Sequence, residues 1–500
     1  MKNIVLSNDC ETIAKEIDRL TDTSDQQGLK SYLLQIETAI SSDDAFVSGP
    51  VFYYLGTAFS TLSAWSQKHS GAGENVDFVK YNKKSLFYLR RSIDLLETQK
   101  PMDPLLLMSA YTNYANVLDS CCRVIESLRI YRKCIRLNPK FGMALGNYGR
   151  TLQFYANTVN DAGHYTELHC YAYQAVKRAL NLQDPNVHNS ARKYFEQILI
   201  NYEATGQKEL LEEPIVFKTY SMGVNQELEY RKWCLKNHLF LNPLNDLIEQ
   251  ESAFAHDSLV ITRYSENVGD TKGEKRNDIE PPKCFSMLNQ LKEEYIYARF
   301  LLFEATKQAR EVHYADKNVK IALSSYEYAN YSIRLEQIKS AYKTLFSVID
   351  KVAFAINSCW KLGIKERNAS AEKVFNCKQY PKNNHALSAM FWSYCEFSDD
   401  FCESETGSER DLKILRNAFE HKFVKIHEFH KDRKLEIESD DFYHVSEEDL
   451  KKHALRLLEI SREFIMEFTY AIGIEENKLN AEEKATVFLP IIDFDDKWKV

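Results

Sequence analysis

The sequence predicts an all-α protein, with an N-terminal array of paired helices followed by a C-terminal helical bundle. Only 16 Gly and 11 Pro occur among 500 residues, well below their usual shares of about 7% and 5%. Apolar residues recur at the three- and four-residue spacing of amphipathic helices through most of the chain. Paired segments of this kind repeat in the N-terminal half, which is typical of stacked helical repeats.

The repeats begin near Phe52 and each places small residues where two helices would meet. The three copies carry their landmark residues at Phe52, Leu55, Gly56, Phe59, Ser85, Leu89 and Ser92; at Tyr111, Tyr114, Ala115, Leu118, Ser127, Tyr131 and Cys134; and at Leu145, Tyr148, Gly149, Leu152, Ala172, Val176 and Ala179. These offsets resemble the 34-residue tetratricopeptide (TPR) pattern, although any array of helical hairpins would share the apolar spacing. We expect residues 1–205 to form a TPR-like repeat region that binds a protein or peptide partner.

A connector at 206–282 separates the repeats from the bundle, and it contains one helix around 226–240 and a polar linker at 265–282. The bundle is expected at 283–475, before a tail at 476–500. Its predicted helices cover 283–309, 318–363, 385–398, 408–430 and 446–471. Ser408 and Ser446 are each followed three residues later by an aspartate, which predicts two N-terminal helix caps. The segment 434–445 is expected to form a short strand or hairpin.

Charge and composition narrow the classes of function. The chain has 64 Lys+Arg against 72 Asp+Glu and a net charge of −8, so any nucleic acid would have to bind a local basic patch. The eleven cysteines form no C-x-x-C pair and are expected to be buried thiols in a reducing compartment. The start lacks a signal-peptide pattern and no apolar run approaches 18 residues. We therefore expect a cytoplasmic protein with no membrane partner.

Several signatures of catalysis are absent from the sequence, including the G-x-x-x-x-G-K-[ST] phosphate loop, the G-x-S-x-G elbow and the zinc motif H-E-x-x-H. His427 and His430 are spaced to share a metal on a helix, but no third ligand is evident. We expect them to be solvated, and we predict neither a metal nor a cofactor.

The most informative motif is R-N-x-x-x-H, formed by Arg416, Asn417 and His421. Cleavage of RNA without a metal needs a group that moves a proton near neutral pH, and His has an unperturbed pKa near 6.5. The guanidinium of Arg416 can donate two hydrogen bonds to the extra negative charge of a pentacoordinate phosphorus. Asn417, four positions before His421, can orient the histidine or the phosphate.

The helix predicted at 408–430 has two faces. Its core face is expected to carry Leu412, Leu415, Phe419, Phe423 and Ile426, and its opposite face Ile414, Asn417, Ala418, His421 and Val424. The mixture of polar and apolar residues on the second face predicts a subunit interface with catalytic groups set into it. Arg416 lies roughly 140° from His421 around one helix, so two facing helices would align the pair better.

Residues 283–471, anchored by this motif, resemble the HEPN superfamily (higher eukaryotes and prokaryotes nucleotide-binding). The connector segment RKWCLKNHLFLNPLNDL is also similar to a segment of bacterial HEPN proteins with TPR-like N-terminal regions. The resemblance implies a metal-independent endoribonuclease, active as a homodimer in which two motif helices face each other, and often a toxin or anti-phage effector. Lys422 and Lys425 are candidates for phosphate contact, the alternative being ordinary solvent-facing lysines.

We therefore expect an enzyme that cuts RNA by attack of the 2'-hydroxyl and leaves a 2',3'-cyclic phosphate, controlled through its TPR-like half. Two alternatives stay open. The first is a non-catalytic scaffold in which both halves bind proteins. The second is a HEPN partner of a separately encoded nucleotidyltransferase in a toxin–antitoxin pair. For the motif residues themselves, the alternative is an ordinary interface arginine at Arg416, paired with Glu420, and a surface histidine at His421.

Overall fold

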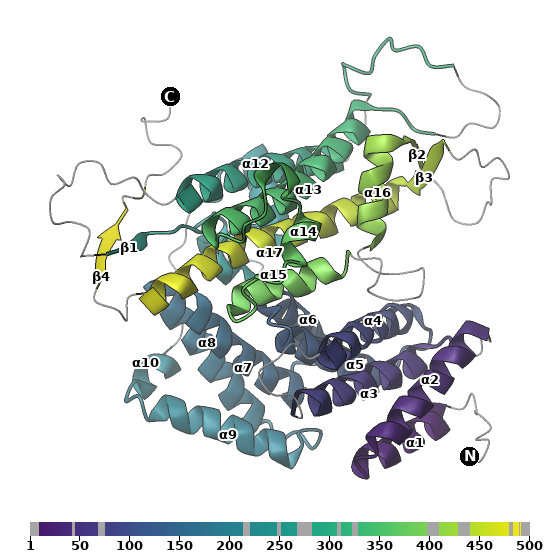
Figure 1. The fold of residues 1–500 in the computed structure, drawn as a ribbon, viewed down its shortest axis with the longest axis vertical. Coiled ribbons are helices and arrows are strands. Elements are labelled where there is room, and N and C mark those ends of the chain that lie inside the picture. The colour runs from purple at the N-terminus through teal and green to yellow at the C-terminus, as the bar shows by residue number, and fades with distance from the viewer. Residues whose placement is uncertain are drawn as a thin grey trace. The chain divides into compact units, whose positions relative to one another are not determined.

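A computed structural model of the chain shows the predicted all-helical architecture (Figure 1). It describes residues 10–42, 46–68, 76–213, 221–247, 252–267, 283–307, 312–322, 329–397, 410–428, 441–479, 484–489 and 491. In these ranges the chain forms seventeen α-helices and two sheets of two strands each. The all-α prediction is confirmed. The helices form two compact units, α1 to α10 and α11 to α17.

The first unit contains ten helices. They are α1 (Cys10–Asp22), α2 (Gln26–Ser42), α3 (Gly49–Lys68), α4 (Val76–Thr98), α5 (Pro104–Ser120), α6 (Val124–Leu137), α7 (Gly142–Thr158), α8 (Ala162–Asn181), α9 (Asn189–Glu203) and α10 (Lys208–Glu212). Local sequence explains where they begin. The Asp103 carboxylate accepts hydrogen bonds from the backbone N–H groups of Leu105 and Leu106, each at 3.1 Å, and Pro104 occupies the first turn of α5.

Small residues stand where α3 and α4 approach each other. The Ser85 hydroxyl donates to the carbonyl of Gly56, and the Ser92 hydroxyl to that of Gly49, each at 2.7 Å. Gly49, near the start of α3, is bonded from Ser92, and the later Gly56 from the earlier Ser85, so the two helices are antiparallel. A Cβ added to Gly56 would lie 2.5 Å from Cγ of Leu89, which leaves no room for a side chain.

The next two helix pairs repeat this arrangement. The Ser127 hydroxyl on α6 donates to the Ala115 carbonyl on α5 at 3.0 Å. A Cβ added to Gly149 on α7 would lie 2.6 Å from Cγ2 of Val176 and 2.8 Å from the carbonyl oxygen of Ala172, both on α8. These are positions where the repeat pattern predicted small residues. The TPR-like assignment and its boundary at residue 205 stay predictions.

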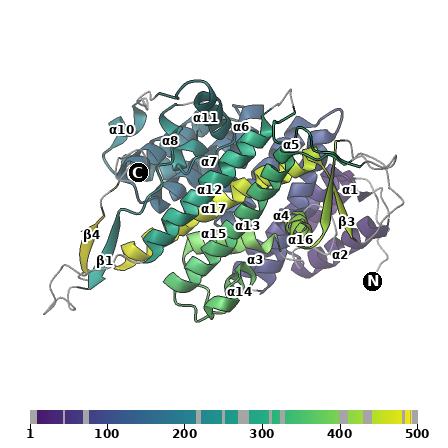
Figure 2. The same ribbon diagram turned by 90° about the horizontal axis from the view of Figure 1, so that it is seen from above.

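The second unit contains the remaining elements. They are α11 (Gln226–Lys236), 3₁₀ turns at Pro243–Asp246, Ser252–Phe254 and Glu366–Asn368, β1 (Arg263–Asn267), α12 (Lys283–Thr306), α13 (Ile333–Cys359), α14 (Ala371–Phe375), α15 (His385–Cys395), α16 (Arg410–His421), β2 (Phe423–His427), β3 (Phe442–Ser446), α17 (Glu447–Leu479) and β4 (Lys484–Phe488). The long helices α12, α13 and α17 run side by side (Figure 2). Their facing apolar side chains, including Leu345, Val352 and Ile465, are fully buried and form the core of the bundle.

Two helix starts test the predicted caps and boundaries. Ser446 caps α17, because its hydroxyl accepts from the Asp449 N–H at 2.9 Å, as predicted; Ser408 lies outside the described residues. The helix predicted to begin at 318 begins instead at Ile333. Ser332 accepts from the N–H of Leu335 at 3.3 Å and starts the helix there, while Asn330 donates to the Ile426 carbonyl in β2 at 2.7 Å.

Two buried arginines hold the segment around 230–257 onto the bundle helices. Arg299 on α12 donates to both carboxylate oxygens of Asp257, at 2.9 and 2.7 Å, and to the Leu239 carbonyl at 2.8 Å. Arg462 on α17 donates to the carbonyls of Phe240 and Asn242, at 2.6 and 2.9 Å. Much of the predicted connector therefore packs against the bundle within the second unit.

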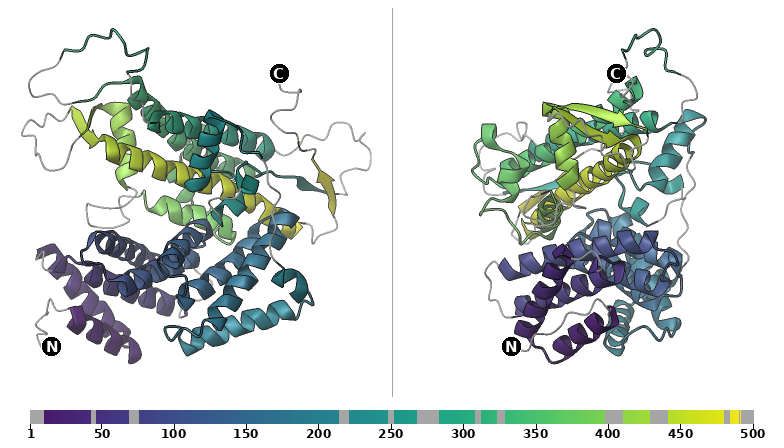
Figure 3. Two further views of the ribbon diagram at one scale, coloured as in Figure 1. Left: turned by 180° about the vertical axis from the view of Figure 1, so that it is seen from behind. Right: turned by 90° about the vertical axis from the view of Figure 1, so that its right-hand side faces the viewer.

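The two sheets lie at opposite ends of α17 (Figures 1 and 3). At its C-terminal end β1 pairs antiparallel with β4, which forms within the predicted tail. At its N-terminal end β2 pairs in parallel with β3. Ten cysteines in the described ranges are free, and six of them are buried as predicted. None of the helices in those ranges is long and apolar enough to cross a membrane.

Candidate functional site

The motif helix α16 is fixed to α13 by its apolar face. Leu412, Leu415 and Phe419 are buried there, as predicted. The Tyr342 hydroxyl on α13 donates to the Leu412 carbonyl at 2.8 Å, and its ring lies edge-on to Phe419 with centroids 5.4 Å apart. Ala418 was predicted on the opposite face but is also buried. This contact sets the orientation of the polar side of α16.

The three motif residues are not on one side of α16: Asn417 and His421 lie about 40° apart around the helix, and Arg416 lies roughly 140° from His421. Asn417 and His421 are exposed and Arg416 is half-buried. Arg416 Nη1 donates to Oδ1 of Asn417 at 3.2 Å. Glu420 lies 3.9 Å from Lys343, and in the described ranges Arg416 forms no ion pair with an acidic side chain. The predicted alternative, an Arg416–Glu420 pair, is therefore not what this helix forms.

The helix ends at His421, whereas the sequence predicted that it continues to 430. Lys422 donates its N–H to the Ala418 carbonyl at 2.9 Å, and the chain then enters β2. The segment Phe-Val-Lys-Ile-His contains aromatic and β-branched residues and alternates apolar and polar residues from Val424 onward, which suits a strand, and β3 supplies a parallel partner. Lys422 thus lies at the junction of helix and strand, and Lys425 lies in β2.

The change from helix to strand alters the surroundings of two side chains that were predicted to lie in the core. Phe423 is 73% exposed, and Ile426 is buried from the strand rather than from a helix. Of the predicted strand or hairpin at 434–445, residues 442–445 lie in a strand parallel to β2; residues 434–440 lie outside the described ranges.

The two faces of the β2–β3 pair differ. Side chains alternate along a strand, so Val424, Ile426, Tyr443 and Val445 share one face, which is half-buried at Val424 and Tyr443 and buried at Ile426 and Val445. Burial, with the nearby carboxylates of Asp411 and Asp449, raises the pKa of Tyr443 on this face. The other face carries Phe423, Lys425, His427, Phe442 and His444. The rings of Phe423 and Phe442 have centroids 5.8 Å apart, and Lys425 Nζ lies 4.2 Å from the Phe442 centroid.

A histidine pair closes the inner end of that second face. His427 Nε2 lies 2.8 Å from Nδ1 of His444, with ring planes 10° apart. His427 is only 5% exposed, so the prediction that it is solvated is wrong; His430 lies outside the described residues. Strand pairing places the His427 side chain inward, which a helix at this position would not do.

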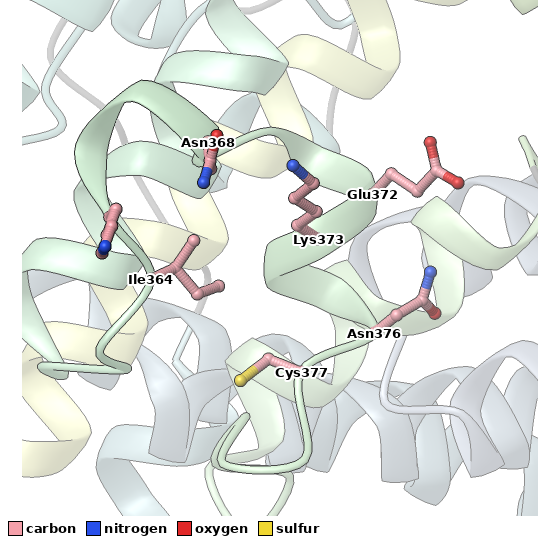
Figure 4. Close-up of a pocket in the computed structure, with 7 residues that line it drawn as sticks. Ile364, Asn368, Glu372, Lys373, Asn376 and Cys377 are labelled. Atoms are coloured by element: carbon pink, nitrogen blue, oxygen red, sulfur yellow. The ribbon is translucent and has the colours of Figure 1, made fainter.

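No cluster of three His, Cys, Asp or Glu side chains suited to a metal occurs among the residues that the structure describes. An open hollow of about 720 Å³ lies beside α14, bordered by side chains that include Ile364, Lys373 and Cys377 (Figure 4). None of the motif residues lines it. The candidate site is therefore limited to α16, which holds the three motif residues, and to the strand pair that follows it.

Comparison with protein families supplies the assignment of this region. Residues 275–475 match the family described as LA2681-like HEPN. The C-terminal part of the chain contains a HEPN domain. Comparisons with curated proteins and with solved structures each found no match.

The HEPN domain spans α12 to α17 almost completely and includes the motif helix. Sequence reasoning missed the aromatic face that follows His421, because it extended the helix through Phe423. The alternation of Val424, Lys425, Ile426 and His427, together with the β-branched and aromatic residues of this segment, was a signal for the strand. The sequence also did not reveal the anchoring roles of Arg299 and Arg462, because these depend on partners far away in the sequence.

Proposed function

We propose that the HEPN domain is a metal-independent endoribonuclease that cuts RNA by attack of the 2'-hydroxyl on the adjacent phosphate. The products are a 2',3'-cyclic phosphate and a 5'-hydroxyl. The observation that carries this proposal is on α16, where His421 and Asn417 are exposed and Arg416 donates a hydrogen bond to Asn417. Asn417 and His421 are open to solvent, and the half-buried Arg416 is linked to them through its hydrogen bond to Asn417.

In the proposed mechanism His421 moves the proton. Its imidazole takes the proton from the 2'-hydroxyl or gives one to the leaving 5'-oxygen, since histidine exchanges protons near neutral pH. Arg416 stabilises the negative charge on the phosphoryl oxygens through its guanidinium. The hydrogen bond from Arg416 to Asn417 supports a role for the amide in orienting that guanidinium.

We further propose that the active form is a dimer through the motif helix. Arg416 and His421 are five residues apart, which separates them by roughly 140° around α16. A second α16 facing the first would bring His421 of one copy toward Arg416 of the other. Lys422 and Lys425 would then bind phosphates on either side of the scissile bond.

The first unit is the proposed control element. A TPR-like array offers a concave surface to a protein or peptide, and a ribonuclease within a cell needs restraint. A regulated toxin or anti-phage effector in the cytoplasm is the biological role that this combination favours.

The deciding experiment incubates the full-length protein and its His421→Ala variant with total RNA in EDTA and maps the cut ends. We expect cleavage by the wild type only, with cyclic phosphate and 5'-hydroxyl ends. His313→Ala, which removes another exposed histidine of the second unit, serves as the matched control and should cut normally. Cleavage that needs a divalent metal or survives in His421→Ala would overturn the mechanism, and no cleavage by the wild type would favour the scaffold or the nucleotidyltransferase partner.

A further inference from the structure

Two phenylalanines stand on the surface immediately after the motif helix. Phe423 is 73% exposed and Phe442 is 38% exposed, although both lie in strands. Their rings are neighbours across the parallel pair, with centroids 5.8 Å apart and ring planes tilted by 36°. Parallel strands are usually covered on both faces, so an open pair of phenyl rings at this position is unusual. We call Phe423, Phe442 and Lys425 the aromatic-basic face.

The exposure of this face changes along the strands. At the end next to His421 the phenyl rings are open to solvent, and at the other end His427 and Ser446 are buried. The strand pair is thus anchored at one end and presents its aromatic end beside the motif. Since Phe423 is only two residues from His421, the Cα atoms of the two residues lie within about 7 Å of each other.

The charges around the rings favour an anionic occupant. Lys422 is exposed, and Lys425 Nζ lies 4.2 Å from the centroid of the Phe442 ring. Glu420, the acidic residue next to His421 in the sequence, is 3.9 Å from Lys343. The exposed Asp441, which immediately precedes β3, is the acidic residue next to Phe442. Aromatic rings interleaved with cations are what single-stranded nucleic acid requires: planar faces for its bases and positive charge for its phosphates.

We propose that the aromatic-basic face is a nucleobase subsite, in which a base flanking the scissile phosphate stacks on Phe423 and Phe442. Lys425 and Lys422 hold the adjoining phosphates. The occupant is single-stranded, because a base within an A-form duplex has no free face for a phenyl ring. This inference rests on the proposed function, and it assigns Phe423 and Phe442 as substrate-positioning residues.

Binding is the test, measured by fluorescence anisotropy with full-length protein in the inactive His421→Ala background. The probes are a labelled single-stranded dodecamer RNA and a ribose-phosphate dodecamer without bases. Base stacking on one aromatic side chain contributes roughly tenfold in affinity. We therefore expect Phe423→Ala and Phe442→Ala each to weaken RNA binding about tenfold, and to leave binding of the baseless oligomer unchanged.

Three further variants keep the test decisive. Phe423→Trp should retain binding because it keeps a stacking ring, whereas Phe423→Leu keeps an apolar strand residue and should bind as weakly as Phe423→Ala. Phe488→Ala removes a phenyl ring that is also 73% exposed, on β4, and should bind like the parent. The inference would be overturned if Phe423→Ala and Phe442→Ala lost equal affinity for the RNA and for the baseless oligomer. It would also be overturned if these variants changed the sedimentation of the protein without altering RNA binding, because the face would then be a contact between copies.

The outcome separates this inference from the proposed function. If the wild type cuts no RNA but base-dependent binding falls in Phe423→Ala, the subsite stands and the nuclease proposal fails. If the wild type cuts RNA and His421→Ala does not, but Phe423→Ala and Phe442→Ala bind the RNA as tightly as the parent, the nuclease proposal stands and the subsite fails.

Discussion

Arg462 on α17 donates to both carboxylate oxygens of Asp246, at 2.8 and 3.2 Å, with both side chains almost completely buried. The same guanidinium also donates to two backbone carbonyls of the 240–242 turn. One arginine therefore satisfies four buried acceptors. This contact fixes a segment outside the HEPN family match to a helix within it.

Replacing Arg462 with Leu should destabilise the second unit by about 3–5 kcal/mol, because the Asp246 carboxylate would remain buried without a partner. Urea unfolding, with hydrogen exchange of residues 234–247, measures the effect. Arg456→Leu is the matched control on the same helix, since its pair with Glu459 is only partly buried, and it should cost less than about 1 kcal/mol. Equal losses of stability in Arg462→Leu and Arg456→Leu would show that Arg462 does not anchor the 240–246 segment.

Mixed dimers can test whether the motif residues act across two copies. The His421→Ala and Arg416→Ala subunits carry different tags, so that purification through both tags yields only dimers with one subunit of each kind. If His421 works with Arg416 of the other copy, one of the two sites stays intact and the mixed dimer should keep about half of the wild-type activity. Each homodimer should be inactive.

The reciprocal dimer pairs a wild-type subunit with the double variant Arg416→Ala/His421→Ala. Shared sites predict no activity here, because each site then lacks either Arg416 or His421. Sites complete within one subunit would reverse both results, giving half activity in this dimer and none in the first. Ribonuclease assays on the two preparations therefore decide between the arrangements.

The sequence predicted the helices and caps that depend on local pattern. Ser446 and Asp449 identified the start of α17 because a cap is made within one turn. Arg416, Asn417 and His421 were found by motif, and the exposure of Asn417 and His421 followed from helical spacing. Ala418 was misplaced because it lies about 60° from both Leu415 and His421 on a helical wheel, so the position of α13 decides its burial.

The errors arose where distant residues decide the structure. The apolar positions 412, 415, 419, 423 and 426 continue a helical spacing past His421, but β3 and Asn330 offer hydrogen bonds to β2 that no local pattern reveals. The strand then exposes Phe423 and buries His427. Tertiary pairing overrode helical periodicity, and it created the aromatic-basic face.

A buried acid on α17 predicts a dependence of stability on pH. Burial, with the negative charges of Glu463 and Asp246, raises the pKa of Glu467 well above its ordinary value of 4.5. The folded state therefore holds a proton that the unfolded state releases, and stability falls as pH rises from 4.5 through the raised pKa. Glu467→Gln should raise the melting temperature at pH 8 and change it little at pH 4. Glu448→Gln, on an exposed turn of the same helix, should show no such difference between the two pH values.

The close approach of α7 and α8 gives a prediction for the repeat region. Gly149→Ala should destabilise the first unit by about 1–3 kcal/mol, because its Cβ would meet the Ala172 carbonyl oxygen at 2.8 Å and Val176 at 2.6 Å. A backbone oxygen cannot move aside as a side chain can, so the two helices must separate. Gly163→Ala, in the first turn of α8, meets only the Asp161 side chain at 3.2 Å and should keep or raise stability. Urea unfolding of both variants measures the contrast; equal stability would mean that small residues at these positions are not what sets the helix spacing.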